Sequence, residues 1–248
     1  MSEKALALND IEGAGTLPME ANQYTVEQLL TALLVGNSST AALALAEKVG
    51  GSEKSFVEKM KQKLSEWGIQ SPHLINATGL NTQTISGDPD GKGDENQLSA
   101  YDIAVIAKHL LQDFPEVTKY TSKPTALFSN TQIENPNLML EGMPNYRSGV
   151  DGLRVSNSTK GGITFAASTT QNGIHMITVV LGVEAVDGDP YARFVATSSL
   201  MNYVVRTFVS SIVVKEGDPY GKSKATVMDG KSETVLAVAK KTSISLKS

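Results

Sequence analysis

The stretch ITFAASTTQNGIHMITVVLGV, residues 163–183, contains two runs rich in β-branched residues on either side of Asn172-Gly173. Valine, isoleucine and threonine favour extended strands, and Asn-Gly is a strong signal for the tight turn of a hairpin. The stretch therefore predicts two antiparallel strands, Ile163 to Thr170 and Ile174 to Val183. A sheet of this kind needs other elements to cover its apolar face, so the flanking sequence must supply them.

The residues after the hairpin predict a long helix followed by a second domain. Pro190 is typical of a helix start, and apolar residues then recur at helical spacing, which favours a helix that packs on the sheet. These residues are Phe194, Met201, Val204, Val205 and Phe208. Beyond Ser211 the sequence changes to short strand-like runs around Asp229-Gly230. We therefore expect one domain over residues 1–210 and the beginning of a small β-rich domain over residues 211–248.

Upstream of the hairpin, from Tyr24 to Asp113, the periodicity is helical. Thr25 with Gln28 forms one capping-box pair, and Ser99 with Asp102 has the same spacing. The predicted helices run from residue 26 to about 35, from 40 to 49, from 52 to 67 and from 99 to 111. Helices followed by an antiparallel sheet indicate an α+β fold.

An acidic segment lies between the third and fourth predicted helices. Asp88, Asp90, Asp94 and Glu95 suggest calcium ligands, because hard cations prefer clustered oxygen atoms. The EF-hand template fails, since Lys92 occupies a ligand position and the closing glutamate is missing. The segment from 86 to 97 is therefore expected to be an acidic surface loop.

Composition excludes several classes of function. The chain has 22 basic and 26 acidic residues and no run of Lys or Arg that would follow a nucleic-acid backbone. The absence of cysteine excludes disulfides and thiolate ligands, and His73, His109 and His175 lack metal-ligand spacing, so we expect no metal or other cofactor. No apolar run approaches the ~20 residues of a membrane span, and residues 1–10 lack the layout of a signal peptide. The chain as written is thus expected to stay in the cytoplasm.

Six short segments, in this order and spacing, resemble the serine-type D-Ala-D-Ala carboxypeptidases, the low-molecular-mass penicillin-binding proteins. They are Tyr24–Leu30, Ala44–Glu47, Asn76–Leu80, Ser99–Asp102, Gly149–Leu153 and Val179–Gly182. The resemblance implies the α+β transpeptidase fold shared by penicillin-binding proteins and β-lactamases. It also implies that the N-terminal part of the domain is missing and that the β-rich C-terminal domain is only begun.

The activity implied by the resemblance is removal of the terminal D-Ala from peptidoglycan stem peptides. Members of the family use the serine of a Ser-x-x-Lys motif as nucleophile, together with a Ser-x-Asn motif and a Lys-Thr-Gly strand. No serine in this chain is followed by lysine three residues later. Without a nucleophile no acyl-enzyme can form, so the chain as written is expected to be inactive.

The Ser-x-Asn position is altered. Alignment on Ala44–Glu47 places Asn37 where the serine belongs and Ser39 where the asparagine belongs, whereas a register shifted by one pairs Ser38 with Thr40. Either register loses the expected amide and weakens the case for acid–base chemistry. A third interpretation is that Ser38 and Ser39 only cap the following helix.

The Lys-Thr-Gly position is altered as well, in the strand Gly149–Ser156, where Arg154, Val155 and Ser156 replace the triplet. Arg154 retains a cation that can hold a carboxylate, although its fork differs from a lysine ammonium. Val155 removes a hydroxyl donor, and Ser156 adds a side chain where glycine permits close approach. The alternative is that Arg154 is an exposed strand residue without a ligand.

Three functions follow from these features. The first is the family's carboxypeptidase activity, present in a longer parent chain that carries Ser-x-x-Lys. The second is a non-catalytic protein or scaffold that binds a D-Ala-terminated stem peptide or a β-lactam weakly. The third is a decayed gene product. The missing part of the domain should also expose apolar surface, which favours self-association. The family itself is extracytoplasmic and membrane-associated.

Overall fold

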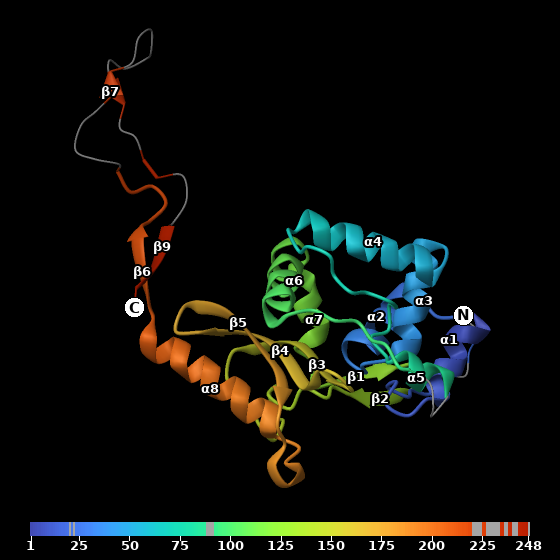
Figure 1. The fold of residues 1–248 in the computed structure, drawn as a ribbon. Coiled ribbons are helices and arrows are strands. Elements are labelled where there is room, and N and C mark those ends of the chain that lie inside the picture. The colour runs from blue at the N-terminus through green and yellow to red at the C-terminus, as the bar shows by residue number, and fades with distance from the viewer. Residues whose placement is uncertain are drawn as a thin grey trace. The chain divides into compact units, whose positions relative to one another are not determined.

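The computed structural model describes residues 1–19, 21, 23–87, 92–219, 225–226, 234–235, 238–239 and 243–247 (Figure 1). The chain divides into two compact units. Unit 1 comprises Met1–Thr170 and His175–Met201, and unit 2 comprises Gln171–Ile174 and Asn202–Ser248. The predicted domain boundary between residues 210 and 211 stays a prediction.

Most of the helices of unit 1 precede the sheet in the sequence. They are α1 (Glu3–Ala7), η1 (Leu8–Asp10), α2 (Val26–Leu34), α3 (Ser39–Gly50), α4 (Glu53–Glu66), α5 (Thr82–Ser86), α6 (Ala100–Asp113), η2 (Pro115–Val117) and α7 (Thr118–Thr121). Both predicted capping boxes are present, at the start of α2 and of α6. The predicted long helices are thus confirmed, while α1 and α5 were not predicted, because each is too short to show a period.

The helical part has its own apolar core. Buried side chains of α2 and α3 pack with Phe128 and Ile133, which lie on the short hairpin of β1 (Thr125–Phe128) and β2 (Thr131–Glu134). The Tyr24 ring stacks on Phe128 with ring centroids 5.4 Å apart. This packing fixes the turn between α2 and α3. The turn forms part of one wall of the cleft described below.

The central sheet contains β3 (Val150–Ser158), β4 (Gly162–Gln171) and β5 (Ile174–Val183) in the order β3-β4-β5. The hairpin predicted from residues 163–183 is therefore confirmed. After the short turn η3 (Val186–Gly188) comes α8 (Ala192–Thr207), which extends past the end of unit 1. Phe194 of α8 meets Phe165 of β4 edge to face at 5.5 Å, so the helix covers one face of the sheet as expected.

Strand β5 forms the outer edge of this sheet. Among the described residues no further strand pairs with it. None of its ten residues is Lys, Arg, Asp or Glu, and Leu181 is 39% exposed. Charged residues are the usual means by which proteins protect an edge strand from pairing with another chain, and β5 lacks them.

The described residues of unit 2 include four short strands. Antiparallel pairs are formed by β6 (Val209–Val214) with β9 (Ser243–Lys247) and by β7 (Ala225–Thr226) with β8 (Thr234–Val235). The strands predicted around Asp229-Gly230 centre on residues outside the described part of the chain. In the residues that the structure describes, no helix combines the length and apolar composition that crossing a bilayer requires.

Candidate binding cleft

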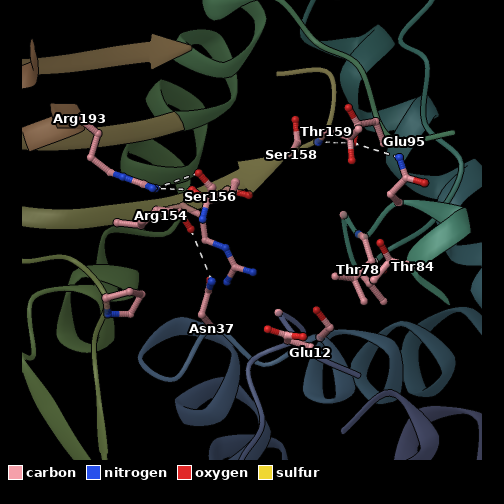
Figure 2. Close-up of a pocket in the computed structure, with 18 of the residues that line it drawn as sticks. Glu12, Asn37, Thr78, Thr84, Glu95, Arg154, Ser156, Ser158, Thr159 and Arg193 are labelled. Carbon is pink, nitrogen blue, oxygen red and sulfur yellow. Dashed lines mark hydrogen bonds between the residues drawn. The ribbon is translucent and has the colours of Figure 1, made fainter. Parts of the chain in front are cut away.

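A cleft of about 830 Å³ lies in unit 1 between strand β3 and the helical part. Figure 2 shows its walls: Arg154 and Ser156 come from the sheet, and Asn37, Thr78 and Thr84 come from the other side. The predicted residues Asn37, Ser39, Arg154, Val155 and Ser156 all line it. Two segments more than a hundred positions apart in sequence are therefore brought to one site.

The pleat of β3 decides which side chains face the cleft. Val155 pairs with Phe165, which packs against α8, so Val155 points to the covered face of the sheet. Successive side chains of a strand alternate between faces. Arg154 and Ser156 therefore project from the opposite face, toward the cleft, and Val155 contributes mainly backbone to it.

Arg154 is the cation at the centre of the cleft (Figure 2). Its Nη1 donates to the carbonyl oxygen of Leu33, near the end of α2, at 2.9 Å. Burial lowers the pKa of Arg154 to about 10, so the guanidinium remains charged at neutral pH. Within the described residues no carboxylate forms an ion pair with it. Arg154 is thus a partly buried cation and not an exposed strand residue.

Asn37 lies at the turn between α2 and α3, with a φ of 59° in the left-handed region that asparagine tolerates. Its Nδ2 donates to the carbonyl oxygen of Val155 at 3.5 Å, a long hydrogen bond that reaches across the cleft to β3. Gly15 packs against the Asn37 backbone so closely that no side chain would fit there. The turn is therefore held from both sides.

Ser38 has a structural role. Its hydroxyl is fully buried and accepts a hydrogen bond from the backbone N–H of Ala41 at 3.3 Å, which caps α3. Thr40 is fully buried as well, whereas Ser39, although only 3% exposed, is among the residues that line the cleft. The register that places Asn37 and Ser39 at the Ser-x-Asn positions is therefore the one whose two residues both reach the cleft.

Arg193 and Glu95 also shape the cleft, and neither was predicted to do so. Arg193 of α8 donates to the carbonyl oxygens of Ser156 at 2.9 Å and Thr164 at 3.0 Å, and also to Oδ1 of Asn157. Burial lowers the pKa of Arg193. Two of these hydrogen bonds hold the end of β3 on the helix behind it, and the third holds β4. Arginine spacing in the sequence gives no signal for this, because two of the three partners are backbone carbonyl oxygens.

Glu95 corrects the prediction of an acidic surface loop over residues 86–97. Its side chain is only 2% exposed, and its carboxylate accepts hydrogen bonds from the backbone N–H groups of Thr159 and Lys160. The carboxylate is buried because these donors replace water. Residues 88–91 of the same segment lie outside the described part of the chain.

The cleft contains groups that can bind an anion and, among its described residues, serine hydroxyls whose surroundings can be compared with those of a catalytic serine. Arg154 supplies a cation, and Ser39 and Ser156 supply hydroxyl groups. In the described residues neither serine hydroxyl is hydrogen-bonded to a lysine or histidine, the bases that would accept its proton and activate it. The same part of the chain contains no group of three or more His, Cys, Asp or Glu residues placed to hold a metal ion.

The fold agrees with the comparisons to known proteins. A family model described as D-alanyl-D-alanine carboxypeptidase matches residues 1–185, and the chain belongs to this family. Members of the family are cell-wall enzymes. The predicted family and its α+β fold are thereby confirmed.

Among individual relatives, the D-alanyl-D-alanine carboxypeptidase DacA of Haemophilus influenzae is 28% identical over 85% of this chain and 49% of its own length. DacF of Bacillus subtilis is 27% identical over 86% and 50%. A solved structure, a peptidoglycan synthesis regulatory factor (PBP3) from Streptococcus pneumoniae, is 47% identical with a TM-score of 0.91, covering 99% of this chain and 69% of that one. The chain thus spans about half the length of the curated relatives it matches.

Proposed function

We propose that this chain is a non-catalytic member of its family that binds the free carboxylate of D-Ala-terminated peptides, or of β-lactams, reversibly at the cell wall. The observation that carries the proposal is the Arg154 guanidinium, a cation without an ion-pair partner among the described residues, placed in a cleft that has no activated serine. A related structure, penicillin-binding protein D2 from Listeria monocytogenes, was solved with ampicillin bound.

The geometry of Arg154 supports recognition of a carboxylate. The hydrogen bond to Leu33 uses one of the five N–H donors of the guanidinium, so other donors remain for a ligand. Arginine binds carboxylates through two parallel hydrogen bonds, and such charge-assisted bonds are strong in a partly buried site. Ser156 and Ser39 add hydroxyl groups on either side.

The competing function is hydrolysis of the terminal D-Ala, the activity for which the curated relatives are named. That reaction needs a nucleophile, and no serine in the 248 residues begins a Ser-x-x-Lys motif. Carboxypeptidase activity would therefore require a longer parent chain that carries the motif. A decayed gene product is the remaining alternative, and it predicts no specific binding.

A fluorescent penicillin and a labelled D-Ala-D-Ala peptide distinguish these functions. We expect no covalent adduct in the mass spectrum, together with saturable peptide binding measured by fluorescence anisotropy. Arg154→Met should weaken that binding about tenfold or more, because it removes the charge-assisted hydrogen bonds. Lys59→Met, which removes an exposed cation on α4, is the control and should leave binding unchanged. A covalent adduct would establish catalysis, and absence of any binding would refute the proposal.

We propose in addition that the chain associates with itself through the edge of β5. The support is the ten-residue edge strand without charged residues, since a two-fold axis would pair it with a second copy without charge repulsion. Leu181→Lys places a charge on this edge and should shift the population toward monomer in size-exclusion chromatography with light scattering. A wild-type chain that is monomeric at high concentration would contradict this.

A further inference from the structure

The carboxylate of Glu95 joins two walls of the cleft. Its Oε1 accepts a hydrogen bond from the backbone N–H of Lys160 at 2.6 Å, and its Oε2 accepts one from that of Thr159 at 3.2 Å. Two successive backbone N–H groups thus converge on one anion, which is how a backbone turn holds a phosphate or carboxylate. At 2% exposure the charge depends on these donors and on Nδ2 of Asn81, which donates to Oε2 at 3.5 Å, because a buried carboxylate without hydrogen bonds is strongly unfavourable.

Asp94, the preceding residue, reinforces the same contact from the surface. Its carboxylate lies 3.2 Å from Nζ of Lys160 and 2.8 Å from Nε2 of His73. The hydrogen bond with His73 is the main reason that the pKa of Asp94 is lowered to about 2. Two neighbouring acidic residues of the helical part therefore hold one turn of the sheet.

That turn, residues 158–162, connects β3 to β4 and is part of the cleft wall. Ser158 and Thr159 line the cleft, and the pairing of β3 with β4 ends at Ser158 and Gly162. Figure 2 shows Glu95 beside Thr159, on the side of the cleft nearest Thr78 and Thr84. Beyond Ser158 the pairing of β3 with β4 ends, and the carbonyl oxygen of Gly161 accepts a hydrogen bond from the backbone N–H of Gly182 on β5 at 2.8 Å. The position of the turn relative to the helical part depends on contacts such as those with Glu95.

We infer that Glu95 is a positioning residue of the cleft: through the backbone of Thr159 and Lys160 it holds the β3–β4 turn at a fixed distance from the opposite wall. By fixing this distance, Glu95 also sets the width of the site in which Arg154 receives a carboxylate. The second statement rests on the proposed function, and the first does not.

The first test measures amide hydrogen exchange by NMR without any ligand. In Glu95→Ala the amides of Thr159 and Lys160 should exchange about tenfold faster or more, because each loses a charge-assisted acceptor. The amide of Ala167, in the middle of β4, should be unaffected, which separates local release of the turn from general destabilisation. Glu116→Gln removes an exposed carboxylate on η2 and should change none of these rates. Unchanged exchange at both turn amides in Glu95→Ala would overturn the inference.

The second test measures the width of the cleft. The chain has no cysteine, so spin labels can be attached specifically to Thr84→Cys and Thr159→Cys. Both positions are exposed; Thr84 belongs to the helical wall of the cleft and Thr159 to the β3–β4 turn of the sheet wall. We expect a narrow distance distribution with Glu95 present and a broader one in Glu95→Ala. Glu95→Gln keeps one acceptor oxygen and should lie between them, and it replaces Glu95→Ala if that variant does not fold. Identical distributions in all three proteins would overturn the positioning role.

The third test is the affinity for a D-Ala-D-Ala peptide. Glu95→Ala should weaken binding severalfold, and Glu116→Gln should not. A widened cleft with unchanged affinity would overturn the part of the inference that concerns recognition. If the wild type binds no peptide, the proposed function fails and that part fails with it, while exchange and distance still decide whether Glu95 positions the turn.

Discussion

Replacing Arg154 by methionine tests whether this partly buried cation contributes to ligand binding and not to the stability of the fold. Methionine has a similar length and no charge, so Arg154→Met removes the guanidinium with a minimal cavity. The variant loses the hydrogen bond to the Leu33 carbonyl oxygen at 2.9 Å. Hydrogen bonds to charged groups contribute about 1.5–3 kcal/mol to stability, which is the expected loss from this term alone.

A second term opposes the first. Burial lowers the pKa of Arg154 from its ordinary value to about 10, which corresponds to roughly 3 kcal/mol of unfavourable free energy for the charged form in the folded state. Methionine relieves this cost. The two terms nearly cancel, so we expect the free energy of unfolding at pH 7 to change by less than about 1 kcal/mol, as for other buried charges replaced by apolar groups.

The assay is urea denaturation of both proteins between pH 7 and pH 11. The folded wild type releases the Arg154 proton at lower pH than the unfolded chain, so above pH 10 the unfolded state binds more protons and wild-type stability rises relative to the variant. Peptide affinity should meanwhile fall about tenfold or more. A stability loss above about 2 kcal/mol at pH 7 with undiminished affinity would show that Arg154 is a structural residue and refute this reasoning.

Three further changes test other parts of the fold. Gly149→Ala should destabilise the protein by more than about 3 kcal/mol in urea unfolding, because φ is 86° there and a Cβ would overlap the Thr170 carbonyl oxygen. Asp94→Asn should lower stability above about pH 5, and the difference from wild type should disappear as the pH falls from 3.8 to about 2, where the native carboxylate becomes protonated. Thr25→Ala removes half of a capping box and should lower the free energy of unfolding by about 1 kcal/mol, measured by thermal unfolding. An unchanged free energy of unfolding would contradict the capping role of Thr25.

The sequence was sufficient to predict elements whose signals are local. The Asn172-Gly173 turn and its β-branched flanks predicted the hairpin, and the capping box at Thr25 predicted the start of α2. These features depend on residues within a few positions of one another. The family and its fold could be predicted because six such local segments occur in the right order.

The parts that could not be predicted depend on partners distant in sequence. Glutamate and arginine are rarely buried, so nothing in the composition predicted a buried position for Glu95 or for Arg193. Both form hydrogen bonds with backbone atoms of the β3–β4 segment. The pattern of apolar residues along the sequence carries no information about such contacts. The sequence identified Arg154 as a residue that can bind a ligand, but it did not predict the hydrogen bond from Arg154 to the carbonyl oxygen of Leu33.

The hydrogen bonds across the cleft also bear on the order of folding. Arg154 to Leu33 spans 121 positions, Asn37 to Val155 spans 118, and Lys160 to Glu95 spans 65. Closing such long loops is entropically costly and slow compared with forming a helix or a hairpin. The α2–α3 pair and the β3–β4–β5 sheet should therefore form first, and the cleft should close last. A refolding chain would regain its circular dichroism before it regains a binding site.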